Sequence, residues 1–435
     1  VTLAACVRLA QRLEAGGWSV LAPLLLVGCW QVLWVAGQPA VDLLVTAAIV
    51  AAVEALTAEP EPRWLDFGLA CGLAAATKYP AAVPTAALML VAVLFFPGRW
   101  RRIGISTAVA VAAASFVPVR NLLTTGNPVY PLLWSLFGGS GWSASDDARW
   151  LSLVHEGVHG FASLPSGIVR LVRPPDGLGW WAVVAAALAL AAVLHAGQGA
   201  RSRRLVAAAA MLGLGGWLVS SQIVRFAFPV ASLLAVLAAA GASRLPRRSA
   251  AAAAVVVPAT VALGLADLGR FTVGRLQIHR MWTGEATRDE WRHRVTLNDP
   301  LPAYRAAEAD LHESARLLVV GEGRSWGCSV PHHVSSFHDR QLIQTWVEAA
   351  STADEVARTA AAEGFSHLLI NWGELERLGG RDFQVLRWRS AADEQRWELF
   401  LRQWTVPLAS SPPCELRAIR APSSGTNSHP LPTRE

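Results

Sequence analysis

Charged residues are scarce in this chain. Asp, Glu, Lys and Arg make up only 16% of its 435 residues, whereas hydrophobic residues make up 53%. Soluble domains carry about 25% charged and about 45–50% apolar residues. The shortage is concentrated in residues 1–269, where Ala, Leu, Val and Gly dominate, and the rest has an ordinary soluble composition. This pattern excludes a disordered chain and a single soluble globule, and it predicts a polytopic α-helical membrane protein with a soluble C-terminal domain.

Cysteine is also too scarce for a disulfide scaffold, since the chain has five. Three of them lie in or beside apolar segments, where cysteine packs as a small hydrophobic residue. Only Cys328 and Cys414 lie in the soluble part and could pair. The net charge of +6 would favour nucleic-acid binding in a soluble protein. Here the arginines cluster in short loops between apolar runs, so we predict the lipid bilayer, and not nucleic acid, as the partner.

About nine segments are apolar enough to cross a bilayer, which takes about 20 residues with a range of about 17–25. Short loops rich in Lys and Arg face the cytoplasm. With nine spans, the Arg-rich loops fall on one side, and the long loop 123–178 and the C-terminal part fall on the other. The nine segments are 18–37, 40–57, 64–78, 80–97, 103–122, 179–196, 205–223, 226–242 and 250–268.

These boundaries predict three regions in a multi-pass protein of the inner or plasma membrane. Residues 1–269 form the transmembrane domain, residues 270–420 a small extracytoplasmic α/β domain, and residues 421–435 a disordered tail. The α/β prediction rests on two short apolar strands, 316–320 and 366–371, which flank a helix over 352–363.

Four ionisable residues lie at the non-cytoplasmic ends of apolar helices. Asp42 opens the second span, Lys78 lies in the turn after the third, Arg120 closes the fifth, and Arg225 precedes the eighth. Charges near the membrane are costly and point to function, although each one alone could be an interfacial anchor. Three cations around one carboxylate suit a phosphate-bearing ligand, with a divalent metal as a further option.

A second motif, His155-Glu156-Gly-Val-His159, matches the H-E-x-x-H pattern of zinc metalloproteases. The two histidines would share one helix face and bind zinc, with Glu156 as general base. The motif lacks a third ligand at a recognised spacing, and glycine inside it weakens the helix. A zinc protease is therefore the less favoured alternative to histidines in a Trp-rich surface loop. We likewise interpret His332, His333 and His338 as a solvated polar cluster.

Several segments together resemble the bacterial membrane glycosyltransferases of the GT-C superfamily, which include protein mannosyltransferases and the aminoarabinose transferase of lipid A. The most specific is VRNLLTTGNPVYP at 119–131. GLACGLAAATKY at 68–79, QIVRFAFP at 222–229, AVDL at 40–43 and GFSHLLIN at 364–371 add to it, so the resemblance covers nearly the whole chain.

The resemblance implies transfer of a sugar from a polyprenyl-phosphate donor to a lipid, glycan or protein acceptor on the outer membrane face. In the family, an acidic residue of the first outer loop is the catalytic base or the metal partner, and Asp42 matches a second acidic position at a later helix start. Asp42 is our candidate catalytic residue, with a divalent metal such as Mg or Mn as a further option. The residues that would bind substrate or phosphate are Lys78, Tyr79, Arg120, Asn121, Asn127, Tyr130 and Arg225.

The chain departs from the family pattern at its start. The family has one more span and an acidic outer loop before the point where this chain begins, so we expect an N-terminal truncation. Ala40 and Phe226 stand where the family carries tyrosine. An alternative to the enzyme is therefore a non-catalytic GT-C-fold protein that binds a lipid phosphate or a glycan.

Overall fold

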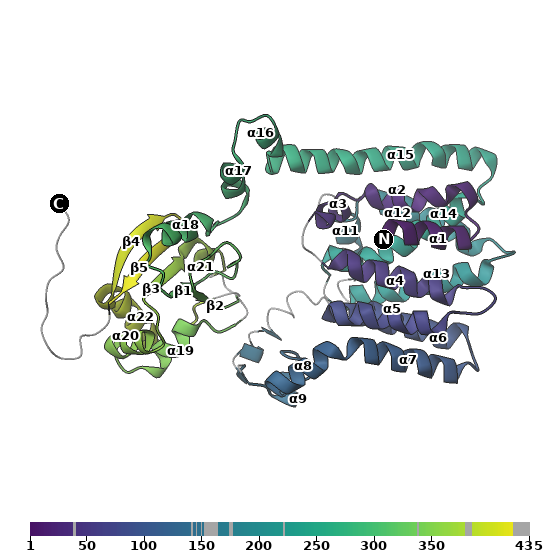
Figure 1. Cartoon of the computed structure of the whole chain (residues 1–435). Helices are drawn as coiled ribbons and strands as arrows, with labels where there is room; N and C mark the ends of the chain where they lie inside the picture. The colour runs from purple at the N-terminus through teal and green to yellow at the C-terminus, as the bar shows by residue number, and fades with distance from the viewer. Residues whose placement is uncertain are drawn as a thin grey trace, which may run out of the picture. The chain divides into compact units, whose positions relative to one another are not determined.

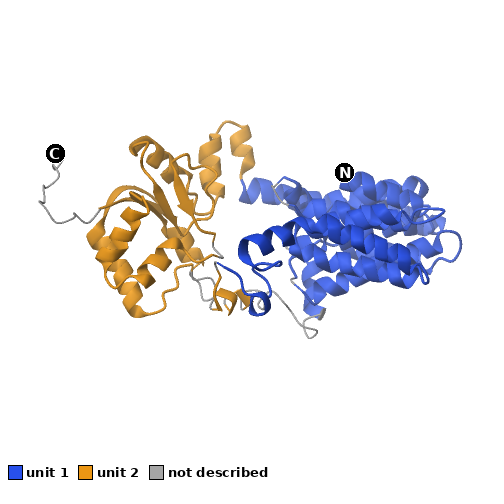
Figure 2. Cartoon of the chain, turned by 60° about the horizontal axis from the view of Figure 1, so that its bottom comes forward, with its two compact units in different colours: residues 1–141, 154–276 blue, residues 142–153, 277–435 orange. Residues whose placement is uncertain are grey.

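The computed structural model describes residues 1–37, 41–140, 142–144, 146–148, 150–151, 164–173, 177–220, 222–336, 339–378 and 385–420. The motif residues His155, Glu156 and His159, together with His338 and the predicted tail 421–435, lie outside the described residues. The chain divides into two compact units (Figure 2). The helical unit comprises residues 1–141 and 154–276, and the α/β unit comprises residues 142–153 and 277–435.

The helical unit is a bundle (Figure 1), as expected for long runs of Ala and Leu, which favour helix strongly. Its elements are α1 (Thr2–Arg12), η1 (Gly16–Val20), α2 (Leu21–Val27), α3 (Trp30–Ala36), α4 (Asp42–Leu56), α5 (Trp64–Thr77), η2 (Tyr79–Ala81), α6 (Ala82–Phe95), α7 (Trp100–Ala114), α8 (Phe116–Thr125), α9 (Trp134–Phe137), α11 (Leu164–Val172), α12 (Trp181–Leu194), α13 (Ala200–Leu218), η4 (Val224–Ala227), α14 (Phe228–Ala242), α15 (Arg247–Arg270) and η5 (Phe271–Arg275).

Helix α14 forms the core of the bundle. Every residue of α14 except Leu234 is buried, and α14 packs against α12, α13, α2, α4 and α1. A helix that is apolar on all sides belongs in the middle of a bundle. Because α14 follows η4 directly, its fixed position also fixes that short helix.

Glycines allow two helix pairs to approach closely. A Cβ on Gly241 of α14 would overlap the backbone of Leu188 in α12, and one on Gly68 of α5 would overlap Ser106 in α7. Any larger residue would force these helices apart. The hydroxyl of Ser106 donates to the carbonyl of Trp64 at 2.8 Å, which adds a polar contact between α5 and α7.

Among the described residues, two helices are long and apolar enough to cross a membrane: η4 with α14, and α15 with η5. Two bent pairs raise this number to four if each pair is one span. Predicted span 18–37 is bent by 75° between α2 and α3, and predicted span 103–122 is bent by 50° between α7 and α8. Each of the nine predicted segments contains helix, and their number as membrane spans stays a prediction.

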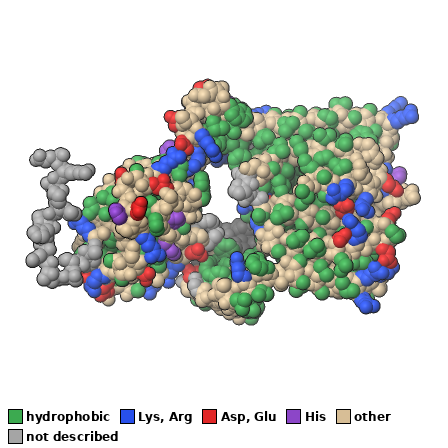
Figure 3. All heavy atoms as spheres, viewed as in Figure 1, with side chains coloured by type: hydrophobic (Ala, Val, Ile, Leu, Met, Phe, Trp, Pro, Cys, Tyr) green, Lys and Arg blue, Asp and Glu red, His purple; other side chains and the backbone are tan. Residues whose placement is uncertain are grey.

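Charged side chains gather at the end of the bundle where α6 ends and α7 begins (Figure 3). The carboxylate of Glu54, which is 8% exposed, lies within 3.8 Å of arginine nitrogens of Arg8, Arg12 and Arg63. These arginines belong to α1 and to the turn before α5, so one buried carboxylate joins three parts of the chain. Similarly, Glu14 pairs with Arg203 and Arg244, and Glu61 pairs with Arg99 and Arg102.

The α/β unit contains a five-stranded sheet with the order β2-β1-β3-β5-β4. Strand β1 is parallel to β2 and β3, whereas β5 is antiparallel to β3 and β4. Its elements are α16 (Ile278–Trp282), α17 (Arg288–Val295), α18 (Leu301–Asp310), β1 (Leu317–Val320), β2 (His332–Val334), α19 (Leu342–Ala349), α20 (Ala353–Ala362), β3 (His367–Asn371), α21 (Trp372–Leu378), α22 (Ala391–Trp404), β4 (Thr405–Ser411) and β5 (Cys414–Ile419).

The two faces of this sheet have separate cores. Leu318, Val320 and Leu368 pack with α19, α20 and α22, whereas Leu317 and Val319 pack with α18. The predicted strands 316–320 and 366–371 and the helix between them are present, so a small sheet with helices on both faces exists. The five cysteines, including those at 328 and 414, are free thiols. The extracytoplasmic location of this unit stays a prediction.

Candidate functional site

Asp42 is the first residue of α4, and it is buried although it carries a charge. A carboxylate is favoured there because the N-terminus of a helix carries a partial positive charge. A buried carboxylate needs partners as well. Two cations from distant parts of the chain supply them.

The first cation is Lys78, which is the C-cap of α5. Its backbone is extended, with φ −166° and ψ 136°, so the helix stops and the side chain turns away from α5. The Lys78 ammonium lies 2.7 Å from Oδ1 of Asp42 and 4.0 Å from the centroid of the Phe226 ring. The ammonium is therefore held between a carboxylate and the face of an aromatic ring.

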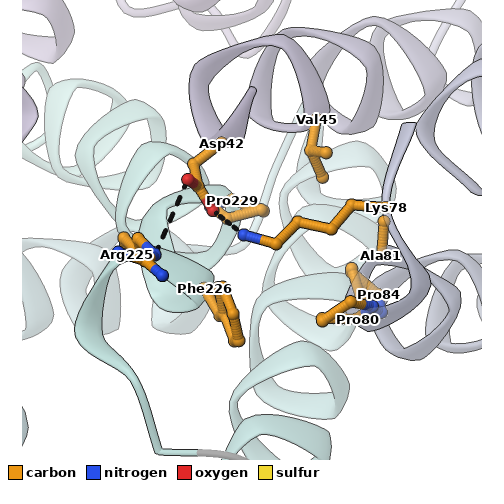
Figure 4. Close-up of a pocket in the computed structure, with 9 residues that line it drawn as sticks. All are labelled: Asp42, Val45, Lys78, Pro80, Ala81, Pro84, Arg225, Phe226 and Pro229. Atoms are coloured by element: carbon orange, nitrogen blue, oxygen red, sulfur yellow. Dashed lines mark hydrogen bonds and ion pairs between the residues drawn. The ribbon is translucent and has the colours of Figure 1, made fainter. Parts of the chain in front are cut away.

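The second cation is Arg225 in η4. Its Nε lies 3.7 Å from Oδ2 of Asp42, and its guanidinium carbon lies 5.5 Å from the Phe226 centroid. Figure 4 shows Lys78 and Arg225 approaching the two carboxylate oxygens from different sides. The three charges were predicted from their positions at helix ends, and the structure brings them together. Phe226 was noted in the sequence only as a departure from the family pattern.

These side chains line a small cavity of about 20 Å³, enough for about one water molecule. Prolines and apolar side chains from α4, η2, α6 and α14 form its remaining wall: Val45, Pro80, Ala81, Pro84 and Pro229. Two cations and one carboxylate leave a net charge of +1 in this apolar wall. Such a site attracts an anion, and a phosphate would have to displace part of the ion pairing to enter.

A divalent metal at Asp42 does not fit the described residues. Both carboxylate oxygens already face cations, which would repel a metal ion. In the part of the chain that the structure describes, no group of three or more His, Cys, Asp or Glu side chains is arranged to hold a metal. This includes His332 and His333, which lie on β2.

A second hydrogen-bonded group begins at the residue after Lys78. The Tyr79 hydroxyl donates to the carbonyl of Tyr130 at 2.9 Å and accepts from the Asn121 amide at 2.9 Å. Arg120 donates to the Asn121 oxygen at 3.0 Å. Arg120 is exposed, and no carboxylate lies within ion-pair distance of it among the described residues. This group therefore offers an additional cation to an anionic ligand.

Asn127 is fully buried and binds the backbone of its own turn. Its amide nitrogen donates to the carbonyls of Leu132 and Gly138, and its oxygen accepts from the Val129 amide. These contacts fix the turn that carries the Tyr130 carbonyl. They indicate that Asn127 supports the site by holding this turn. Direct binding of phosphate by Asn127 stays a prediction.

No protein-family model matches this sequence, and no curated protein matches it. Solved structures match its fold. The crystal structure of ArnT from Cupriavidus metallidurans bound to undecaprenyl phosphate has a TM-score of 0.54 and 13% sequence identity, and the match covers 98% of this chain and 83% of that chain. The apo-state structure of ArnT gives 0.54 and 14%, with 96% and 82% covered. The chain therefore has the same fold as ArnT, and this confirms at the level of the fold what its sequence segments predicted.

Proposed function

We propose that this chain is an integral-membrane glycosyltransferase that moves a sugar from a polyprenyl-phosphate-linked donor to a lipid, glycan or protein acceptor on the outer membrane face. The fold it shares with ArnT supports this class, and one of the two matched ArnT structures holds undecaprenyl phosphate. The helices long and apolar enough to cross a membrane support a location in the inner or plasma membrane.

One observation carries the proposal: two cations converge on one buried carboxylate at the end of the bundle. Such a site can bind a phosphate and also provide a base. Charge-assisted hydrogen bonds from Lys78 and Arg225 would hold the phosphate of the donor. In an apolar cavity, these bonds are stronger than in water.

The proposed reaction is a single displacement at the anomeric carbon of the sugar. The acceptor hydroxyl or amine attacks this carbon and passes its proton to Asp42, which acts as general base. The bond between the anomeric carbon and the phosphate oxygen breaks, and its electron pair leaves with the polyprenyl phosphate. Lys78 and Arg225 stabilise the negative charge that develops on the leaving phosphate.

The second hydrogen-bonded group would extend the phosphate site. Arg120 provides a further cation, and Tyr79 and Asn121 hold it in place through their hydrogen bonds. Tyr130 contributes its carbonyl to this network, and Asn127 fixes the turn on which it lies. We assign no role to a divalent metal, because the described donor set does not suit one.

The same geometry supports a second candidate, a non-catalytic protein that binds a lipid phosphate. Both oxygens of Asp42 are paired with cations, and a paired carboxylate is a poor base until a ligand takes over those cations. Turnover separates the two candidates, because only the enzyme releases polyprenyl phosphate from a glycosylated donor.

The test uses the full chain, purified and placed in lipid nanodiscs with a panel of polyprenyl-phosphate sugars. Release of polyprenyl phosphate and transfer of label to a lipid or peptide acceptor are measured. We expect Arg225→Ala to lower the rate by about 10²-fold or more, as for removal of an electrostatic group in an active site. Binding of polyprenyl phosphate without turnover of any donor would favour the non-catalytic candidate.

Arg101→Ala is the matched control for this test. Arg101 is an exposed arginine at the start of α7, and it lines no part of the cavity. It should leave the rate unchanged. Equal losses in Arg101→Ala and Arg225→Ala would point to loss of net charge and would count against the site.

A further inference from the structure

The ring of Phe226 contacts both cations of the candidate site. Its centroid lies 4.0 Å from the Lys78 ammonium and 5.5 Å from the guanidinium carbon of Arg225. Both distances are within the roughly 6 Å over which a ring face attracts a cation. Phe226 is half-buried and lines the cavity, so its ring belongs to the site and not only to the apolar packing around it.

Two cations that share one carboxylate repel each other. A second carboxylate would remove this repulsion, but it would also cancel the positive charge that attracts an anion. An aromatic ring offers a negative face without a formal charge, and it offers no strong hydrogen-bond acceptor that would occupy the N–H donors. Phe226 can therefore hold Lys78 and Arg225 near each other and leave their charge available.

The identity of the first cation supports this interpretation. Lys78 is the only lysine among the 38 Lys and Arg residues of the chain. Lysine carries a compact charge with three rotatable donors, whereas arginine carries a flat fork. A compact ammonium fits between the carboxylate at 2.7 Å and the ring centroid at 4.0 Å. The one place where the chain uses lysine is thus the place where the charge lies between a carboxylate and a ring.

We propose that Phe226 is a positioning residue whose ring face seats Lys78 and Arg225 so that both can bind the phosphate of a polyprenyl phosphate together. This inference rests on the proposed function, which identifies the anion as that phosphate. Phe226 acts through the two cations and does not itself touch the reacting atoms.

The single lysine allows a direct test in the full chain. Reductive methylation with ¹³C-formaldehyde labels Lys78 and the N-terminal amine and keeps the lysine charge. Because a dimethylammonium group has one N–H donor where lysine has three, affinities are measured on unlabelled protein. The dimethyl-lysine resonance then reports where the ammonium lies, because a ring face at this distance shifts it upfield. In wild-type protein, polyprenyl phosphate should move this resonance.

Three variants test the ring, and one serves as control. Phe226→Leu keeps an apolar side chain but removes the ring face, whereas Phe226→Tyr and Phe226→Trp retain a ring. The control is Phe96→Leu, because Phe96 also faces an arginine, Arg201, at 4.8 Å but does not line the cavity.

We expect Phe226→Leu to weaken polyprenyl-phosphate binding about tenfold, which corresponds to about 1.4 kcal/mol. Its lysine resonance should also lose the upfield shift. Phe226→Tyr and Phe226→Trp should bind within about threefold of wild type, and Phe96→Leu should bind as wild type does. In the transfer reaction, Phe226→Leu should raise KM for the donor more than it lowers kcat, because the ring acts on binding.

Two results would overturn the inference. One is wild-type binding in Phe226→Leu together with weakened binding in Lys78→Ala, which would leave the proposed function intact. The other is a lysine resonance that is the same in Phe226→Leu and in wild type. If Phe226→Leu does not fold, Phe226→Trp decides, since a folded Trp variant that loses tenfold in affinity contradicts the role of the ring. Failure of wild-type protein to bind or turn over any donor would refute the proposed function, while the resonance would still report on the ring.

Discussion

Replacing Asp42 by asparagine is expected to tighten the binding of a polyprenyl phosphate and to slow sugar transfer strongly. The carboxylate occupies the two cations that the phosphate needs, at 2.7 Å from Lys78 and 3.7 Å from Arg225. Asparagine keeps the size of the side chain but removes the charge, so the cations become available. The same change removes the general base, which is worth about 10²–10⁴-fold in rate.

The size of the binding effect follows from the exposure of the two cations. A pair of unit charges 4 Å apart is worth about 4 kcal/mol at an effective dielectric constant of about 20. Arg225 is 49% exposed, so its ion pair is screened to about 0–1 kcal/mol. Lys78 is 24% exposed and in direct contact with Asp42, so its pair keeps more of its energy. We expect a net gain of about 1.4 kcal/mol, or about tenfold in Kd.

The assay combines equilibrium binding of labelled polyprenyl phosphate with single-turnover transfer, both in nanodiscs at fixed salt. Asp66→Asn is the matched control, because Asp66 is an exposed carboxylate in the first turn of α5 that pairs only with Arg63 among the described residues. It changes the net charge by the same amount as Asp42→Asn. Weaker or unchanged binding in Asp42→Asn would refute competition between carboxylate and phosphate. Transfer at the wild-type rate would refute the general base.

Three further predictions concern stability. Gly241→Ala should destabilise the bundle by about 1–3 kcal/mol, because the new methyl group would overlap the backbone of Leu188. Gly104→Ala should instead stabilise α7 by up to about 1 kcal/mol, because the space around Gly104 is open. Thermal unfolding in detergent measures both changes. Glu54→Gln should lower the unfolding temperature and cost at most about 3 kcal/mol, because the arginines around Glu54 are partly exposed and can rehydrate. Burial lowers the pKa of His367 below its ordinary 6.5, so the folded α/β unit binds fewer protons than the unfolded chain and loses stability as the pH falls through 6.5. The protection of the β3 amides against hydrogen exchange, relative to the intrinsic rate at each pH, should therefore fall on acidification, and it should fall less in His367→Asn.

The helices could be predicted from the sequence, because the length of each apolar run indicates a helix and the ends of the run give its approximate bounds. The bends could not be predicted. Hydropathy averages over a segment, and it is the same whether the helix is continuous or broken between α2 and α3. That break lies where a Cβ on Gly28 would crowd Val261 of α15, a contact between residues far apart in the sequence.

Part of the site was open to prediction because charges are rare in this half of the chain. Asp42, Lys78 and Arg225 could be identified by their places at helix ends, but nothing local shows that they meet. Phe226 could not be assigned to the site from the sequence, because it is one of 13 phenylalanines in an apolar chain. Two features of the composition could have identified more of the site. Lys78 is the only lysine in the chain, and Tyr79 and Tyr130 are two of its three tyrosines.

The two hydrogen-bonded groups of the site are joined by a single peptide unit. The backbone at Lys78 is extended, and Tyr79 begins the short helix η2, so helix α5 does not continue through these two residues. Lys78 thus reaches Asp42, whereas Tyr79 reaches Asn121 in α8 and the carbonyl of Tyr130. Pro80 cannot donate a backbone hydrogen bond and so resists continuation of α5. It therefore helps to end α5 at the point where Lys78 and Tyr79 reach their separate partners.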